Sequence, residues 1–130
     1  NGDGNLDLAV VVAGEESIEI YKGDGLGNFK MLSRHETGVN PHGLTSGDFD
    51  KDGNLDLAVS NRTSGGITIF LGKGNGDFEN TSSIYTGNDG IAIANGDFDG
   101  DGNIDLAMVS ASSHSLLFYR GDGKGGFNPW

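Results

Sequence analysis

The chain has no cysteine, only two prolines and no long hydrophobic run. Without cysteine there is no disulfide framework and no thiolate metal site. No apolar stretch approaches the roughly 20 residues that a membrane-spanning helix needs. Neither an initiator methionine nor a signal peptide opens the sequence, so we expect the chain to be a processed or excised piece of a longer protein.

Basic side chains are also scarce, because 8 of them stand against 19 acidic ones and leave a formal net charge of −11. A negative charge of this size repels phosphate backbones and anionic membrane surfaces. We therefore expect neither a nucleic-acid partner nor insertion into a membrane.

Glycine, in contrast, is abundant: the 130 residues include 24 glycines, and 35% are apolar. This composition is typical of many short strands joined by tight turns, and not of helices or of a disordered tail. It predicts an all-β fold.

Two motifs recur three times each with a spacing of 49 residues. The first is Gly-Asn-(Leu/Ile)-Asp-Leu-Ala, which begins at Gly4, Gly53 and Gly102, and the second is a glycine-rich stretch that ends in phenylalanine at 23–29, 72–78 and 121–127. A period of this length suits a β-propeller blade of four strands. Helical repeats of similar period would need amphipathic stretches, which the sequence lacks.

Each unit is predicted to contribute four antiparallel strands. The innermost covers 43–47, with 91–96 as its next copy. The central strand, mostly apolar and expected to be covered on both faces, covers 6–12, 55–60 and 104–110. The third covers 18–21, 67–71 and 116–119, and the polar outer strand covers 78–85.

The repeat divides the single propeller segment 1–130 into three units. These are 1–47, truncated at its start, 48–96, and 97–130, truncated at its end. The chain thus holds roughly two and a half four-stranded blades of an incomplete propeller.

An acidic loop precedes the central strand of every unit. In a nine-position frame, the loop that begins at Asp48 carries carboxylates at positions 1, 3, 5 and 9. Ca²⁺ prefers several such hard oxygens, and Gly53 permits the sharp bend. Without a cation, the carboxylates would repel one another by roughly 1 kcal/mol per pair. A solvated acidic turn does not explain why the same spacing recurs at the same place, so we predict calcium sites.

The predicted ligands follow from this frame, with the asparagines at position 7 offering backbone carbonyls. They are Asp48, Asp50, Asp52, Asn54 and Asp56 in the second unit, Asp97, Asp99, Asp101, Asn103 and Asp105 in the third, and Asn1, Asp3, Asn5 and Asp7 in the first. The first loop lacks position 1. We therefore expect two calcium sites and a partial third.

Other acidic calcium loops do not fit. EF-hands and dockerins need flanking helices, and an EF-hand needs a glutamate at position 12, where this chain has Val59 or Met108.

The unit, with Asp-x-Asp-x-Asp-Gly-x-x-Asp between its first and second strands, resembles the FG-GAP/VCBS repeat of integrin-like β-propellers over essentially the whole chain. The resemblance implies an extracellular or cell-surface propeller, commonly seven-bladed, with its calcium loops on one rim. Loops of this type fill readily at millimolar extracellular calcium, which also favours secretion.

The function that the resemblance implies is non-enzymatic binding or adhesion to a protein or glycan. One alternative is an accessory propeller of an extracellular polysaccharide-acting enzyme. Another is a structural subunit, because two and a half blades cannot close such a ring and open blades leave unpaired strand edges that invite association. The chain is then either a fragment of a longer protein or a unit whose copies assemble.

Several other residues carry weaker signals. The glycine-rich stretches are interpreted as hairpin turns and not as phosphate loops, because no Lys-Ser/Thr pair or helix follows them. Asn61 and Asn80 match the N-glycosylation pattern. Six aromatic side chains recur at equivalent positions and are predicted to pack between blades: Tyr21, Phe29, Phe70, Phe78, Tyr119 and Phe127.

Overall fold

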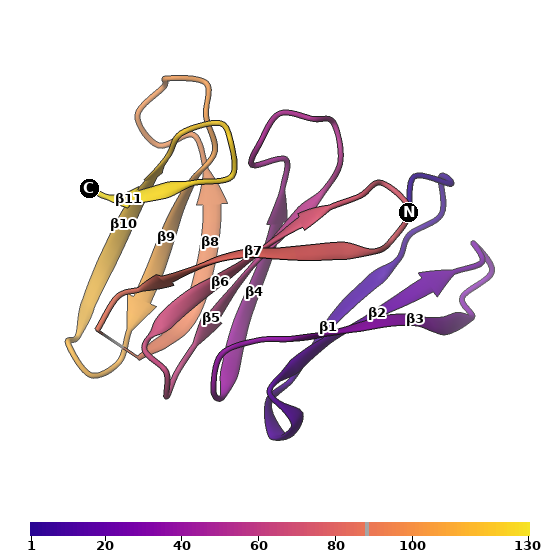
Figure 1. The fold of residues 1–130 in the computed structure, drawn as a ribbon, viewed down its shortest axis with the longest axis horizontal. Helices are drawn as coiled ribbons and strands as arrows, with labels where there is room; N and C mark the ends of the chain where they lie inside the picture. Colours follow the sequence, from indigo (N-terminus) through magenta and orange to yellow (C-terminus); the bar gives the residue numbers. More distant parts are fainter. Residues whose placement is uncertain (88) are drawn as a thin grey trace.

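The computed structural model describes residues 1–87 and 89–130, and these form three antiparallel sheets side by side (Figure 1). The first sheet contains β1 (Leu8–Val12), β2 (Ser17–Gly23) and β3 (Phe29–Glu36). The second contains β4 (Pro41–Gly47), β5 (Asp56–Asn61), β6 (Gly66–Gly72) and β7 (Phe78–Tyr85). The third contains β8 (Gly90–Gly96), β9 (Asp105–Ser110), β10 (Ser115–Gly121) and β11 (Phe127–Pro129). The predicted all-β fold of incomplete propeller blades is confirmed.

Neighbouring strands in each sheet are neighbours in the sequence, as in a blade. Strand β5 is buried along its whole length, as predicted for a central strand, and β6 beside it is nearly so. Strand β7 is mostly exposed, which confirms the polar outer strand. The helical part of the described residues is one short 3₁₀ turn, η1 (Ala13–Glu15), and none of it is long and apolar enough to cross a membrane.

Two clusters of apolar side chains hold the three sheets together. Between the first and second sheets lie Ile18, Ile20, Leu57, Val59 and Phe70. Between the second and third sheets lie Phe49, Ala58, Ile67, Ile69, Leu106, Met108 and Tyr119. Full burial of such a side chain contributes roughly 1.5–3 kcal/mol. The second sheet therefore packs against a neighbouring sheet on both of its faces, and the first and third sheets do so on one face each.

The innermost strands approach one another closely. A Cβ atom on Gly43 of β4 would lie 3.0 Å from the Cα of Ala92 in β8, so a side chain at this position would push the strands apart. Nearby, the hydroxyl of Thr45 donates to Asn95 Oδ1 at 2.5 Å, and Asn95 Nδ2 donates to the carbonyl of Ser46 at 3.2 Å. These contacts fix how the second and third sheets are aligned.

The first sheet differs from the prediction in one respect. Its central strand β1 was expected to be covered on both faces, but Leu8 and Val10 are exposed. The same expectation fails for β9 of the third sheet, where Val109 is exposed. Side chains alternate between the faces of a strand, and one face of each of these two sheets has no neighbouring sheet within the described residues. The recurring aromatics divide in the same way: Phe70, Phe78, Tyr119 and Phe127 pack between sheets, as predicted, whereas Tyr21 and Phe29 lie at the outer face.

The two glycosylation motifs also differ in their surroundings. Asn61 is only 2% exposed, and its Nδ2 donates to Thr68 Oγ1 at 2.9 Å. A buried side-chain amide cannot carry a glycan in the folded protein, so Asn61 is not a glycosylation site although its sequence matches the pattern. Asn80 is exposed on β7.

Candidate metal loops

The acidic loops connect the innermost strand of a sheet to the next strand. One loop joins β4 to β5, a second joins β8 to β9, and a third precedes β1. All three lie on the same side of the row of sheets (Figure 1). The repeat therefore places the predicted ligands along one rim.

The loop between β4 and β5 brings three carboxylates together. One oxygen from each of Asp48, Asp50 and Asp52 lies within 4.8 Å of the others. The loop curls because its own carboxylates accept backbone N–H groups: Asp48 accepts from Asp52 and Gly53 at 3.1 Å each, and Asp50 accepts from Asp52 at 3.1 Å. Gly53 has a φ of +89°, a conformation that disfavours other residues.

The loop between β8 and β9 has the same curl but a different group of converging side chains. Asp97 accepts from the backbone of Gly100 at 2.8 Å and of Gly102 at 3.0 Å. Here the carboxylate oxygens within 4.8 Å of one another belong to Asp97, Asp99 and Asp105, and the group does not include Asp101.

The aspartate at position 9 links the loop to two strands. Asp56 is fully buried; its Oδ2 accepts from the backbone N–H of Phe49 at 2.6 Å, and its Oδ1 accepts from that of Gly72 at 2.8 Å. Burial raises the pKa of Asp56, and the negative charges of Asp50 and Asp52 raise it further. The two hydrogen bonds of Asp56 tie the loop to β6, and the predicted role of Asp56 as a ligand stays a prediction.

Asp105 forms both of these bonds, and Asp7 forms the one to the hairpin. Asp105 accepts from the backbone of Phe98 and of Gly121 at 2.9 Å each, and Asp7 accepts from that of Gly23 at 2.9 Å. The bond to the hairpin therefore belongs to the repeat and not to one loop.

The asparagines at position 7 contact the carboxylate two residues before them. Asn54 donates to Asp52 through its backbone N–H at 2.7 Å and its Nδ2 at 2.8 Å, and both bonds lower the pKa of that carboxyl. Asn103 bonds Asp101 in the same way, at 2.7 and 2.9 Å. The predicted use of their backbone carbonyls as ligands stays a prediction.

The glycine-rich hairpin supports the loop, a role that the sequence interpretation missed. A Cβ atom on Gly72 would lie 2.1 Å from the carbonyl oxygen of Leu55, and one on Gly74 would lie 2.4 Å from Asn54 Oδ1. The same clashes recur at Gly23 and Gly121. The sequence carried a signal for this role, because these glycines recur in every unit although a turn alone does not require all of them.

The second and third hairpins also lie against the loop of the preceding unit. The backbone N–H of Gly125 donates to the carbonyl of Phe49 at 3.1 Å. At the equivalent place one unit earlier, a Cβ atom added to Gly76 would lie 3.2 Å from the Cβ of Asn1. Loops and hairpins therefore alternate along the rim.

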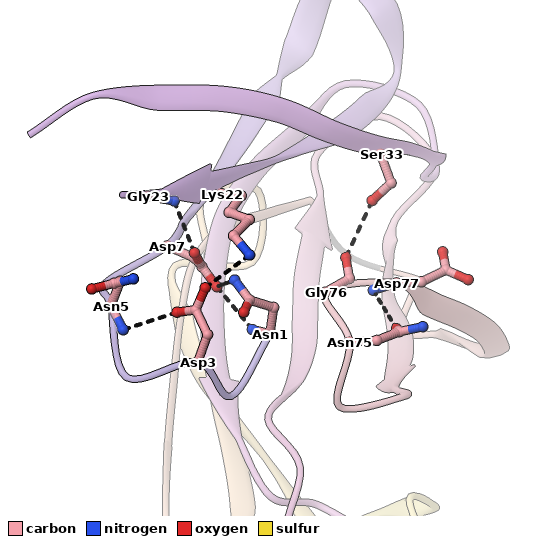
Figure 2. A network of polar contacts seen from close by, with 10 residues as sticks. All are labelled: Asn1, Asp3, Asn5, Asp7, Lys22, Gly23, Ser33, Asn75, Gly76 and Asp77. Carbon is pink, nitrogen blue, oxygen red and sulfur yellow. Dashed lines mark hydrogen bonds and ion pairs between the residues drawn. The ribbon is translucent and has the colours of Figure 1, made fainter. Parts of the chain in front are cut away.

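The first loop has the fewest carboxylates of the three, and Figure 2 shows its contacts. Asn1 Nδ2 donates to Asp7 Oδ2 at 2.7 Å, the backbone N–H of Asn5 donates to Asp3 Oδ1 at 3.0 Å, and Lys22 Nζ lies 2.9 Å from Asp3 Oδ2. The bond from Lys22 lowers the pKa of Asp3. Among the described residues, this loop contributes no group of three converging carboxylates.

One position of the repeat decides whether a loop has its own counter-charge. Lys22, Leu71 and Arg120 are 49 residues apart. Lys22 pairs with Asp3, and Arg120 Nε lies 2.7 Å from Asp99 Oδ2. The middle loop has Leu71 at this position, so its carboxylates have no basic partner from this position of the repeat.

The donor set suits a hard divalent cation. All converging atoms are carboxylate oxygens, and two oxygens that share one Ca²⁺ at about 2.3–2.6 Å lie at most about 5 Å apart. The separations within 4.8 Å in the loops at Asp48 and Asp97 meet this limit. These clusters of acidic side chains could hold a metal ion.

The comparison with known protein families gives one result. The model of the FG-GAP-like repeat matches twice, over residues 1–59 and 48–108. The two matches share 48–59, which contain the middle acidic loop and most of β5. Comparisons with curated proteins and with solved structures gave no match. Because the family model covers most of the 130 residues, the chain belongs to the FG-GAP-like repeat family.

Proposed function

We propose that the chain is a calcium-stabilised segment of an extracellular β-propeller and that it acts as a non-enzymatic module for binding or adhesion to protein or glycan ligands. One observation carries the proposal: a group of three carboxylates recurs at the same strand junction in successive repeat units. A turn that served only solubility would not need to recur at one junction with the same curl.

In the proposed site, the side chains of Asp48, Asp50 and Asp52 supply three oxygens. A bound calcium ion would supply the positive charge that offsets their mutual repulsion. Asp56 accepts backbone N–H groups of Phe49 and of β6, and these bonds hold the loop in the shape that presents the other three.

The family and the kind of loop support the extracellular setting. Calcium sites of extracellular modules commonly have dissociation constants of about 10⁻⁴–10⁻³ M, which matches millimolar calcium outside cells. The loops lie on one rim beside the hairpins, so filling them would stiffen that rim for display of neighbouring loops to a ligand.

The calcium part of the proposal is tested by thermal unfolding with calcium and with a chelator. We expect a clearly lower melting temperature in chelator, and we expect Asp48→Asn together with Asp50→Asn to reduce this difference. Glu79→Gln, which removes an exposed acid on β7, is the matched control and should keep the full difference. A melting temperature that chelator does not change would refute the calcium sites.

The binding part is tested separately, on a glycan array probed in calcium and in chelator. Binding to one class of glycan that is lost in chelator would support the proposal. An array with no signal would contradict its glycan half.

A further inference from the structure

The fourth position of the acidic loop differs between the units. The residues there, 49 apart in the chain, are Gly2, Lys51 and Gly100, and their φ angles are +71°, +64° and +78°. Glycine adopts this left-handed conformation readily, whereas a residue with a Cβ atom rarely does. Lys51 is thus a lysine where the backbone favours glycine, and an outlier of this kind directs attention to what its side chain contacts.

Wherever another unit follows, the fourth position lies against the glycine-rich hairpin of that unit. A Cβ atom on Gly2 would lie 3.6 Å from the carbonyl oxygen of Gly74. The Cε atom of Lys51 lies 3.3 Å from the place that a Cβ on Gly123 would occupy, and Gly123 is 49 residues after Gly74. The repeat therefore directs this position toward the next unit, and Lys51 extends a charged side chain in that direction.

The part of the hairpin that Lys51 reaches is the part that supports the third acidic loop. The same point on Gly123 is 2.5 Å from Asn103 Oδ1, and Asn103 donates two hydrogen bonds to Asp101. These bonds lower the pKa of Asp101, burial opposes the shift, and the positive charges of Arg120 and Lys51 lower the pKa further. The ammonium group of Lys51 thus acts on a loop that belongs to another unit.

We propose that Lys51 lowers the calcium affinity of the loop of the next unit, which begins at Asp97. The proposal rests on the calcium part of the proposed function and adds a regulation that passes from one unit to the next. A positive charge beside the loop repels a doubly charged ion and offsets the carboxylates that attract it. The third loop has two such charges, Lys51 from the unit before and Arg120 from its own unit, and fills at a higher calcium concentration than it would without them.

Isothermal titration calorimetry with calcium tests the proposal in a parent chain that carries Asp48→Asn and Asp50→Asn, so that the heat comes from the third loop. Lys51→Gln removes the charge and keeps a long side chain, and we expect roughly two- to fivefold tighter binding. Lys51→Arg keeps the charge and should bind calcium like the parent chain. Lys30→Gln, at an exposed position of β3, removes the same charge from the first sheet and is the control. Circular dichroism establishes that each variant is folded.

Salt separates an effect of charge from a change in the shape of the loop. The Debye length falls from about 10 Å at 0.1 M salt to about 3 Å at 1 M. The ratio of affinities between Lys51→Gln and the parent chain should therefore fall toward one as salt is added. A ratio that salt does not change, or equal tightening in Lys51→Arg, would overturn the proposal.

The contact itself is tested without calcium. We expect a nuclear Overhauser effect between the side chain of Lys51 and the α protons of Gly123 in calcium-free protein, and its absence would overturn the proposal. Calcium binding that Lys51→Gln leaves unchanged would overturn this proposal alone. No calcium binding in any of these chains would refute the calcium site itself, and this proposal with it.

Discussion

The charged residue at one position of the repeat predicts unequal calcium affinities. Arg120 lies 2.7 Å from the carboxylate of Asp99, whereas the equivalent residue of the middle loop is the apolar Leu71. In Arg120→Leu, the third loop loses a fixed positive charge and regains a free carboxylate. Its affinity for calcium should therefore increase.

The magnitude follows from exposure. The Arg120 side chain is 51% exposed, so its interaction with a cation in the loop is close to the value in water, about 1 kcal/mol for unit charges 4 Å apart. An increase of about 1 kcal/mol corresponds to roughly fivefold tighter binding. A doubly charged ion and partial burial would increase this figure, and the flexibility of the arginine would reduce it.

Isothermal titration calorimetry is the assay, carried out in a chain with Asp48→Asn and Asp50→Asn so that the third loop dominates the heat. The control is Arg34→Leu, which removes the same charge from the first sheet, where Arg34 pairs with Glu15 and Glu19. We expect Arg120→Leu to tighten binding and the control to leave it unchanged. Equal or weaker affinity in Arg120→Leu would refute the inference that this arginine competes with the ion.

Two further predictions concern stability. Gly72→Ala should lower the free energy of unfolding in urea titrations by about 1–3 kcal/mol, because its Cβ would meet the carbonyl of Leu55. Gly14→Ala, where the space is open, is the control and should change this free energy by less than about 0.5 kcal/mol. Similar effects of the two substitutions would contradict the supporting role of the hairpin. Burial lowers the pKa of His35 below 6.5; the charge of Lys73 lowers it further, and that of Asp77 opposes the shift. Protonation of His35 therefore favours the unfolded chain. The contribution of His35 to stability is full above pH 6.5 and is lost as the pH falls below it. His35→Ile should therefore show a smaller fall in melting temperature between about pH 7.5 and 5.5, and an unchanged fall would contradict this account.

The strands were predictable because their signal is local. The repeat aligns three copies of each strand, and nearly continuous apolar composition separates the central strands from the polar outer one. For β7 the predicted range and the observed range, Phe78–Tyr85, coincide. The exposed face of β1 was not predictable in this way, because Leu8 and Val10 have the composition of a buried strand and only the arrangement of whole sheets leaves them uncovered.

The spacing of the acids identified the loops but not how the carboxylates are used. Asp56 lies in the same frame as Asp48, yet both of its oxygens accept backbone N–H groups, one of them from Gly72, 16 residues away. The pairing of Arg120 with Asp99 likewise joins β10 to the acidic loop, and no local pattern connects the two. Contacts of this kind depend on how the hairpin folds back over the loop, which the sequence of the loop does not encode.

The stoichiometry of bound calcium tests the central claim most directly. Equilibrium dialysis of the chain against calcium, with the metal measured by atomic absorption, should give two ions per chain. The value should fall to one when Asp48 and Asp50 are replaced by asparagine, and to one when Asp97 and Asp99 are replaced instead. No bound calcium at millimolar concentration, or two ions retained in both variants, would contradict the assignment of these loops.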